Sequence, residues 1–380
     1  MGDRRLAVMN LISGNGRGGS DRLALDLSVG LKERGHRVIF GAPADCYLSR
    51  EAEHTNVQTF NLYPSGNIDM AGLNELVQFC NKEAIDILNA HHSHSRHLLL
   101  VAKFRGLKAK IVFTRHCILN TVPFFGALPS NLVVDMNIAV SNAVANSLIR
   151  SGIFRRRVRL VYGSVDTQKF QGIPHQTVEE YKARYFAGGY DFVIGMVARL
   201  IHDGNFDPAM PTPKGHDVLI RAVAQLDNRT AILFLGPCLE RDIEKLHLMA
   251  RHYGLPEERL IFAGFQEDMA PFYQMMDLAV LPSPHEGLGL AIIEAMAAGV
   301  PCIGANSGGV AEIITHGKDG FLVKPGDSAE LAEKIAALRS SAPLREEFAA
   351  EGKKTVAARF DLALMAERTE EVFSQLVSDN

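Results

Sequence analysis

The sequence is poor in the features that mark secreted, zinc-binding and membrane-spanning proteins. Its five cysteines are scattered and include no CxxC pair, which argues against a disulfide framework or a zinc site. The longest apolar stretch, residues 288–305, is interrupted by Glu294, glycines and Pro301, so we expect a buried helix and strand there instead of a membrane span. The first apolar run is broken by Asn10 and is too short for a secretory signal. These absences predict a cytoplasmic protein whose membrane association, if any, is peripheral.

Signatures of metal and dinucleotide sites are also missing. Several histidines lie between residues 91 and 116, but no HExxH motif or cysteine partner accompanies them, and no Asp-x-Asp stands at the end of a predicted strand. A literal GxGxxG runs from Gly14 to Gly19, yet residues 40–42 are Phe-Gly-Ala where a dinucleotide fold needs an acidic residue for the ribose. We therefore expect no metal site, no cofactor and a metal-independent reaction.

The 380 residues suit two α/β domains of ordinary size. Net charge is only −3 overall, but residues 1–165 carry +8 and the remainder −11. Such an asymmetry concerns partners more than fold, and a basic first half favours an anionic acceptor or a membrane surface. Nucleic acid is not among the expected partners.

Strand-like and helix-like segments alternate in both halves, which predicts two parallel, doubly wound sheets. We expect a first domain over residues 1–168, a polar linker near residues 166–190, and a second domain over residues 169–359. A last helix, Leu362 to Val377 within residues 360–380, is expected to return to the first domain. The expected strands are residues 6–12, 36–40, 86–90, 110–114 and 136–140, then 192–197, 231–235, 260–262, 277–281 and 301–304.

Two carboxylates eight residues apart, Glu286 and Glu294, are the most informative chemical feature. Glu286 falls in a glycine-bearing loop after a strand-like run, and Glu294 falls two turns into the helix that follows. Each carboxylate can accept hydrogen bonds from two hydroxyls, and a sugar nucleotide offers one diol on its ribose and another on its hexose. The loop also presents backbone N–H groups and a helix N-terminus to an anion. An unpartnered charge among the apolar neighbours of Glu294 would be costly, which favours a binding role.

This run resembles the Glu-x7-Glu signature of retaining glycosyltransferases of family 4. The resemblance implies the GT-B architecture, in which two Rossmann-like domains face each other across a cleft. Arg199 and Lys214 look like the family's basic pair, which would clamp a diphosphate and stabilise the leaving group without metal. The spacing departs from the family pattern because residues 202–213 intervene.

Further residues match the family along most of the chain. His116, at the end of a predicted strand, matches the histidine that contacts the donor hexose, and His91 and His92 match a histidine-containing turn. In residues 158–170, which resemble the interdomain element, Tyr162 replaces the usual Asn. Glu312 is interpreted as a structural partner. The resemblance and the loop chemistry together predict donor contacts at Gly18, Gly19, Phe265, Gly287, Leu288, Gly289, Leu290 and Glu294, and catalytic roles for His116, Arg199, Lys214 and Glu286.

The resulting hypothesis is a hexosyltransferase that uses a nucleotide-diphosphate sugar, with UDP-hexose as the first choice of donor. Its acceptor would be a glycan or a lipid-linked glycan of the cell envelope, such as a lipopolysaccharide or another surface polysaccharide. Two other interpretations stay open: a sugar-nucleotide 2-epimerase of the same fold and a non-catalytic sugar-nucleotide binding module. An NAD-dependent oxidoreductase is disfavoured by the missing acidic residue near Ala42.

A peripheral membrane contact is predicted from charge and apolar residues together. Arg155, Arg156 and Arg157 lie in a run of five arginines over residues 150–159. Residues 121–132 place Phe124 and Phe125 in a loop between two prolines. Basic side chains beside protruding apolar ones suit an anionic membrane surface.

Overall fold

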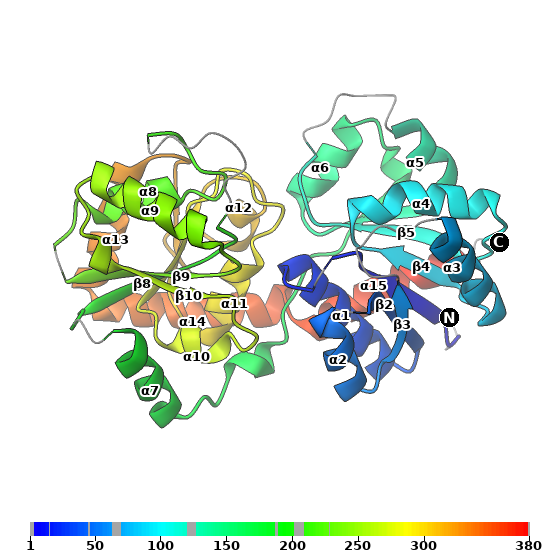
Figure 1. The fold of residues 1–380 in the computed structure, drawn as a ribbon, viewed down its shortest axis with the longest axis horizontal. Coiled ribbons are helices and arrows are strands. Elements are labelled where there is room, and N and C mark those ends of the chain that lie inside the picture. The colour runs from blue at the N-terminus through cyan, green and yellow to red at the C-terminus, as the bar shows by residue number, and fades with distance from the viewer. Residues whose placement is uncertain are drawn as a thin grey trace. The chain divides into compact units, whose positions relative to one another are not determined.

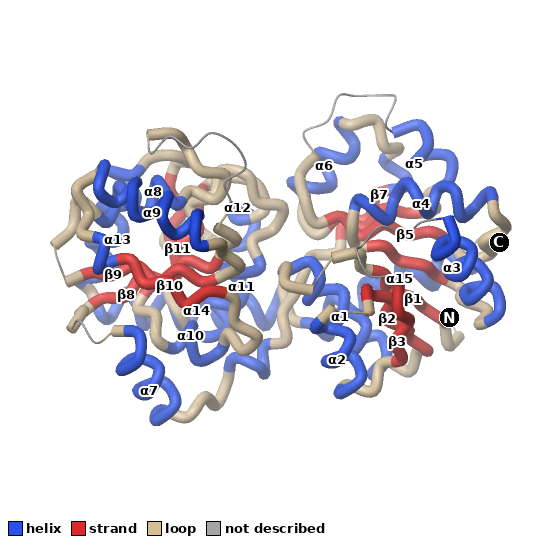
Figure 2. The backbone as a smooth tube through the Cα atoms, viewed as in Figure 1, coloured by secondary structure: helices blue, strands red, loops and turns tan. Residues whose placement is uncertain are grey.

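The computed structural model describes residues 4–14, 16–44, 46–62, 70–119, 127–186, 189–200, 209–227 and 229–378, the side chains of residues 93–98 and 129 excepted. The chain divides into two compact units, Met1–Val165 with Phe360–Asn380, and Asp166–Arg359. Figure 1 gives the order of the elements along the chain, and Figure 2 shows the strands of each unit enclosed by its helices.

In the described part of the first unit, seven parallel strands form one sheet in the order β3-β2-β1-β4-β5-β6-β7. The strands are β1 (Ala7–Leu11), β2 (Arg37–Pro43), β3 (Gln58–Leu62), β4 (Ile87–Ala90), β5 (Lys110–Arg115), β6 (Met136–Ala139) and β7 (Val158–Leu160). The helices are α1 (Gly19–Glu33), α2 (Tyr47–His54), α3 (Met70–Lys82), α4 (Ser93–Phe104), α5 (Ala127–Val133), α6 (Asn142–Arg150), the 3₁₀ turn η1 (Arg155–Arg157) and α15 (Leu362–Ser378).

In the described part of the second unit, six parallel strands follow the order β10-β9-β8-β11-β12-β13. The strands are β8 (Phe192–Val197), β9 (Thr230–Leu235), β10 (Leu260–Gly264), β11 (Leu278–Leu281), β12 (Cys302–Ala305) and β13 (Phe321–Val323). The helices are α7 (His175–Tyr185), α8 (His216–Val223), α9 (Glu240–His252), α10 (Ala270–Gln274), α11 (Leu290–Ala298), α12 (Val310–Ile313), α13 (Ser328–Ser340) and α14 (Ala342–Arg359), with 3₁₀ turns η2 (Thr167–Phe170) and η3 (Glu257–Arg259).

The central strands are buried because helices cover both faces of each sheet, as parallel sheets require. β1, β4, β9 and β11 are buried along their whole length, which explains their nearly continuous apolar sequences. Each sheet has its own core; Met9 and Leu88 belong to the first, and Ile194 and Phe234 to the second. The prediction of two parallel α/β sheets of the Rossmann type is therefore confirmed.

The last helix closes the first unit by packing on α1. A Cβ on Gly30 would lie 2.9 Å from the Cβ of Ala366, so the two helices approach closely where α1 lacks a side chain. Glu370 on α15 pairs with Arg34 and lies 3.3 Å from Nε2 of His36. Since these residues are more than 300 positions apart, α15 completes a layer that the first 165 residues leave open.

Two expectations about the chain's course need correction. Residues 166–190 are not only a linker, because they contain η2 and the eleven-residue helix α7. Val178 is the buried residue of this helix. Tyr181 and Tyr185 pack edge-on against Phe272, a contact that the helix's own sequence does not reveal. The strand β3 was also missed, because its sequence, Gln-Thr-Phe-Asn-Leu, contains no apolar run.

Candidate active site

The order of the strands locates one candidate ligand-binding edge in each unit. Chain order reverses between β1 and β4 in the first sheet and between β8 and β11 in the second. Ligands of doubly wound sheets bind at such switch points, outside the carboxyl ends of the strands. In the second unit Arg199 follows β8, and the loop with Glu286 follows β11. In the first unit the glycine loop follows β1, and His91 follows β4.

The loop after β11 is shaped by glycines on two neighbouring segments. Gly289, the N-cap of α11, lies in the left-handed region at φ +100°. The backbone N–H of Gly309 donates to the carbonyl of Glu286, at 3.0 Å. A Cβ on Gly308 would stand 2.3 Å from that carbonyl oxygen, and one on Gly309 would stand 2.3 Å from the carbonyl oxygen of Gly287. Only glycine therefore allows the two loops to stack this closely.

Lys214 and Glu286 meet in this unit although residues 202–213 separate Lys214 from Arg199. The lysine Nζ lies 2.6 Å from Oε1 of Glu286, and the two side chains are 29% and 14% exposed. The turn that carries the lysine is held by Asp217, whose Oδ1 accepts hydrogen bonds from the N–H and the hydroxyl of Thr212, both at 2.8 Å. Gly215 then brings the turn against Pro282, where a Cβ would lie 2.6 Å from the proline carbonyl oxygen.

Glu294 is held by a residue that sequence reasoning did not select. The hydroxyl of Tyr273, from α10, donates to Oε2 of Glu294 at 2.7 Å. Tyr273 is fully buried, and burial together with the nearby Glu294 carboxylate raises its pKa well above the usual value. The tyrosine therefore stays a neutral donor, and the carboxylate is oriented through one of its two oxygens. Twenty-one positions separate the two residues, so no local pattern in the sequence could have indicated the pair.

The remaining predicted donor contacts in this unit are mostly backbone groups. Leu288 is buried, Leu290 is the first residue of α11, and Gly287 precedes them in the loop. The N-terminal N–H groups of a helix lack carbonyl partners inside the helix and suit an anion. Phe265, half-buried, follows Gly264 after β10. The structure places these groups in the second unit.

Arg199 is exposed at the end of β8 and makes no hydrogen bond or ion pair within the described residues. Its segment runs close to Gly236, where a Cβ would lie 2.3 Å from the carbonyl oxygen of Ala198. Residues 201–208, most of the expected insertion, lie outside the described part. The structure thus brings Lys214 to Glu286, whereas the Arg199 side chain has no such partner in the part of the chain that the structure describes.

His216 is a further residue that the sequence did not single out. It is 3% exposed, packs on the ring of Phe234, and its Nε2 has no hydrogen-bond partner in the described structure. Burial, with a smaller contribution from the positive charge of Lys214, lowers its pKa to about 3. His216 is accordingly neutral at physiological pH, two residues after the lysine of the candidate site.

In the first unit, the glycine loop is fixed by a carboxylate and a histidine. Asp21 caps α1 through a hydrogen bond of 3.2 Å from the Gly18 N–H, and its Oδ1 lies 2.7 Å from Nε2 of His92. The other ring nitrogen of His92 accepts from the N–H of Ser13 at 3.1 Å. Gly19 is the first residue of α1. His92, which was expected only to lie in a histidine-containing turn, therefore fastens both ends of the loop that contains Gly18.

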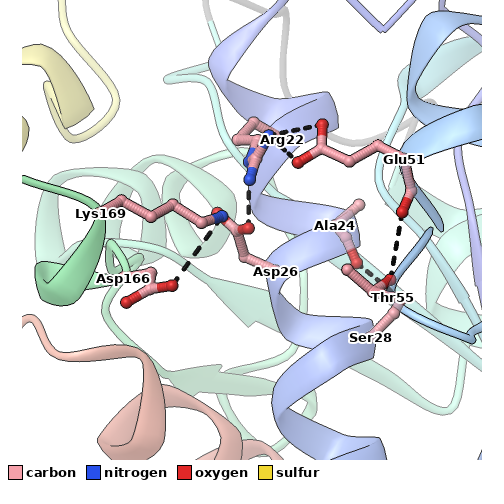
Figure 3. A network of polar contacts seen from close by, with 8 residues as sticks. All are labelled: Arg22, Ala24, Asp26, Ser28, Glu51, Thr55, Asp166 and Lys169. Atoms are coloured by element: carbon pink, nitrogen blue, oxygen red, sulfur yellow. Dashed lines mark hydrogen bonds and ion pairs between the residues drawn. The ribbon is translucent and has the colours of Figure 1, made fainter. Parts of the chain in front are cut away.

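The same helix is anchored outside the loop by Arg22. Its guanidinium bridges Asp26 on α1 and Glu51 on α2, with N–O distances of 3.0 and 2.7 Å (Figure 3). Burial alone would lower the pKa of Arg22, but the two paired carboxylates raise it above its usual value. The first turn of α1 is therefore fixed on both sides.

His116, at the carboxyl end of β5, is joined to His91 at the end of β4. Nε2 of His116 lies 3.1 Å from Nδ1 of His91, and the rings stack with centroids 5.3 Å apart. Burial lowers the pKa of His116 to about 3, and it lowers the pKa of His91 well below its usual range. Both rings are neutral at physiological pH. Asn10 and Asn89, which complete the cluster, had no signal in the sequence.

The structure contains no evident metal site or membrane span in the part that it describes. No group of three His, Cys, Asp or Glu side chains there is arranged to hold a metal ion. None of the helices described combines the length and the apolarity that crossing a bilayer requires.

Comparisons with known families identify relatives for both units. The model of the family described as Glycosyltransferase Family 4 matches residues 17–169, and that described as Glycosyl transferases group 1 matches residues 208–355. The N-acetyl-alpha-D-glucosaminyl L-malate synthase of Bacillus anthracis is 26% identical over 96% of this chain and 95% of its own length. The lipopolysaccharide core biosynthesis glycosyltransferase LpsE of Rhizobium meliloti is 35% identical over 39% of this chain and 42% of its own length.

Solved structures share the fold at low sequence identity. HepE of Anabaena in complex with UDP and glucose has a TM-score of 0.83 and 23% identity, covering 97% of this chain and 100% of that one. A glycosyltransferase of Rickettsia africae has a TM-score of 0.84 and 20% identity, covering 99% and 100%. At this identity the likeness bears on the fold alone.

Proposed function

The chain belongs to family 4 of the glycosyltransferases and has their GT-B fold, and on this premise we propose that it is a retaining, metal-independent hexosyltransferase. The proposed donor is a nucleotide-diphosphate sugar, with UDP-hexose first, since HepE was solved with UDP and glucose. The proposed acceptor is a glycan or a lipid-linked glycan of the cell envelope. LpsE, named for lipopolysaccharide core biosynthesis, supports that acceptor class.

The observation that carries the proposal is the contact between Lys214 and Glu286 at the carboxyl edge of the second sheet. It places a cation and a hydroxyl-binding carboxylate next to the N-terminus of α11. The cation and the helix N-terminus suit a diphosphate, and the carboxylate suits the hydroxyls of a hexose.

The proposed reaction breaks the bond between the anomeric carbon and the diphosphate and forms a bond from that carbon to an acceptor oxygen on the same face. The acceptor's proton passes to the leaving diphosphate. Arg199 and Lys214 would stabilise the negative charge that develops on the diphosphate, and such fixed charges act most strongly where water is excluded. Glu286 and His116 would hold hydroxyls of the hexose, and Glu294 those of the ribose.

Ligand binding and product analysis together test the proposal. A thermal-shift panel of UDP, GDP, ADP and their sugars should show stabilisation by one base only, because a ligand that binds the native state raises apparent stability by mass action. Incubating that sugar nucleotide with candidate acceptors should release the nucleotide diphosphate and yield a product with the donor's anomeric configuration. Conversion to an epimeric sugar nucleotide without transfer would favour the 2-epimerase, and binding without turnover would favour a binding module.

Peripheral docking on an anionic membrane is the second part of the proposal. In the first unit Leu128 and Leu132 of α5 are 55% and 72% exposed, and Phe154 is 47% exposed. Asn131 connects α5 to the segment of Phe154. Its side-chain amide donates to the carbonyl of Gly152 at 2.8 Å, and its Oδ1 accepts from the N–H of Phe154 at 3.0 Å.

Three arginines follow Phe154 directly in the sequence. Arg155 and Arg156 are exposed, and the guanidinium of Arg156 lies 5.0 Å from the ring centroid of Phe154. Arg157 differs, because its guanidinium bonds the carbonyl of Val134. Phe124 and Phe125 lie outside the described residues. Each exposed arginine near an anionic surface contributes on the order of 1 kcal/mol.

Liposome co-sedimentation tests the docking. Binding should require anionic lipid, fall as salt rises, and weaken in a variant with Arg155→Ala and Arg156→Ala. Replacing Arg157 as well should weaken binding further, but it also removes an internal hydrogen bond, so the double variant is the cleaner test. Arg5→Ala with Arg50→Ala, which removes two exposed arginines of the same unit, is the matched control. Equal binding to neutral vesicles, or none at low salt, would favour a soluble acceptor such as the hydroxy acid in the Bacillus anthracis relative's name.

A further inference from the structure

A chain of buried polar side chains runs behind His116, from α1 across β1, β4 and β5. Asn10, Asn89 and Ser28 are fully buried, and Thr114 and His91 are nearly so. Buried polar groups are costly unless they are hydrogen-bonded. The bonds of this chain therefore restrict one another, and the donor and acceptor at each link can be assigned.

The assignment starts at α1. The Ser28 hydroxyl donates to the carbonyl of Ala24 at 2.7 Å, a bond drawn in Figure 3. A hydroxyl has one hydrogen, so Ser28 Oγ acts as acceptor for the side-chain amide of Asn10, 2.9 Å away. Asn10 therefore presents its Oδ1 to the next link, where it accepts from Nδ2 of Asn89 at 2.9 Å.

Asn89 is oriented by two partners and directs its last hydrogen at a histidine. Its Oδ1 accepts from the hydroxyl of Thr114 at 2.9 Å. One hydrogen on Nδ2 goes to Asn10, and Nε2 of His91 lies 3.0 Å from the same nitrogen. Since the amide nitrogen can only donate, Nε2 of His91 must accept. His91 then carries its proton on Nδ1.

The last link fixes His116. Nδ1 of His91 lies 3.1 Å from Nε2 of His116, so the His91 proton is donated to that nitrogen. A neutral His116 must then carry its own proton on Nδ1, the nitrogen not used by the chain. With its proton on Nε2 instead, His91 would direct an N–H at the N–H of Asn89, whose nitrogen is 3.0 Å away. The other acceptor near that Nε2, Oδ1 of Asn10, is farther, at 3.4 Å.

We infer that Asn10, Asn89 and His91 are positioning residues that hold His116 as a neutral imidazole with its proton on Nδ1. In this state His116 can donate a hydrogen bond to a hydroxyl of the substrate through Nδ1. It cannot act as a general base there, because Nδ1 has no free lone pair. The low pKa of both rings, caused chiefly by burial, agrees with the neutral state. The role toward the hexose rests on the proposed function, whereas the tautomer does not.

Nitrogen NMR of the chain without ligand tests the tautomer. Histidine-selective ¹⁵N labelling and long-range ¹H–¹⁵N correlation at about pH 7.5 distinguish protonated from unprotonated ring nitrogens, and His116→Gln identifies the His116 signals by their loss. We expect Nδ1 of His116 to be protonated and Nε2 unprotonated. A protonated Nε2, an average of the two tautomers, or an imidazolium would overturn the inference.

Reversing the polarity of one link gives a second test. Asn89→Asp replaces the donor with an acceptor, so His91 should move its proton to Nε2 and His116 should acquire a proton on Nε2. In the spectrum of each ring, Nε2 should then give the signal of a protonated nitrogen and Nδ1 that of an unprotonated one. Asn74→Asp, the same change at an exposed position on α3, should leave both rings unaltered. If the Asn89→Asp variant folds and the protonation of the His116 nitrogens does not change, these hydrogen bonds do not control that ring. If the variant does not fold, the wild-type spectrum decides alone.

Turnover separates this inference from the proposed function. In Asn89→Asp the hexose loses a hydrogen-bond donor, so kcat should fall about fivefold, the loss expected for one neutral hydrogen bond of about 1 kcal/mol, while donor KM changes less. An exchanged tautomer with unchanged kcat would remove the role of Nδ1 toward the substrate. Absence of any transfer by the wild-type chain would contradict the proposed function and leave the NMR result standing.

Discussion

Lys214 and Glu286 form an ion pair across 72 positions of sequence, with Nζ 2.6 Å from Oε1. The side chain proposed to hold the diphosphate is thus oriented by the one proposed to hold the hexose. Because both are partly exposed, the pair contributes little to stability by itself. Its consequence is functional: the two ends of the sugar–phosphate bond would be bound by groups that fix each other's position.

Glu286→Gln should therefore affect turnover more than nucleotide affinity. The amide keeps the shape of the side chain but weakens its hydrogen bonds to hydroxyls and to Lys214. We expect kcat to fall by the equivalent of about 1.5–3 kcal/mol, the contribution of a charged hydrogen bond, with nearly unchanged calorimetric affinity for the nucleotide diphosphate. Glu333→Gln, at an exposed carboxylate paired with Lys334, is the control. An equal loss of nucleotide and sugar-nucleotide binding would move Glu286 to the nucleotide.

Glu294→Ala should weaken binding of the nucleotide itself. If the carboxylate accepts from the ribose hydroxyls, its removal costs about 1.5–3 kcal/mol, measurable by calorimetry. Tyr273→Phe should weaken binding in the same direction by about 1 kcal/mol, because Glu294 loses the hydroxyl that orients it. Unchanged affinity in Glu294→Ala would refute the ribose contact. Unchanged affinity in Tyr273→Phe alone would show that the tyrosine does not position the carboxylate.

Arg199→Ala combined with Lys214→Ala should slow the chemical step. Two fixed cations that stabilise a leaving diphosphate account for about 2–4 kcal/mol of the barrier. The rate at saturating donor measures this, with EDTA-treated wild-type chain alongside. Full activity in EDTA is expected. If EDTA abolishes activity and Mg²⁺ restores it, the metal-independent reaction is wrong.

Gly308→Ala should disturb the donor loop more than an ordinary glycine substitution. At φ +55° the new Cβ would be strained and would also lie 2.3 Å from the carbonyl oxygen of Glu286. Gly326 is the matched control, because it has φ +82° but a Cβ added there would meet no atom within 4 Å. Backbone strain should cost each alanine variant about 1–2 kcal/mol of stability. The close contact at Gly308 adds to this loss, and only Gly308→Ala should lose donor binding. Equal binding by the two variants would contradict the stacking of the loops.

Acid should destabilise the second unit through His216. Its pKa of about 3 lies below the ordinary 6.5, so below pH 6.5 the unfolded chain binds a proton that the folded chain does not. Stability should fall by about 1.4 kcal/mol for each pH unit between roughly 6.5 and the folded pKa. His216→Phe should reduce this slope in urea unfolding from about pH 7.5 to about pH 5, and His175→Gln, at an exposed histidine, should not. An unaltered slope in His216→Phe would show that the buried ring does not cause it.

The fold and much of the donor loop follow from local patterns. β8 spans the predicted residues 192–197, and α11 follows the glycine-bearing loop as expected, because an apolar run and a glycine turn act over a few positions. The strand β3, with alternating polar residues, and the helix α7, whose aromatic contacts lie elsewhere in sequence, could not be found in this way.

The partners of the site residues depend on the folded sheet. Lys214 meets Glu286, Tyr273 meets Glu294, and Asn89 meets Asn10 only because distant strands and helices become neighbours. Apolar neighbours in the sequence indicate that a carboxylate such as Glu294 will be buried and will need a hydrogen-bond donor. The sequence does not show which donor will satisfy it, so these pairs required the structure.

The closure of the first unit by α15 has a consequence for how the chain folds as it is made. Asp166–Arg359 is continuous in sequence and leaves the ribosome whole, whereas the earlier unit still lacks the helix that covers Gly30 on α1. Domains generally fold as units during synthesis. The later unit should therefore reach its native state first, and the earlier one should mature only after α15 has left the ribosome, so nascent chains arrested before Leu362 should expose α1 to protease.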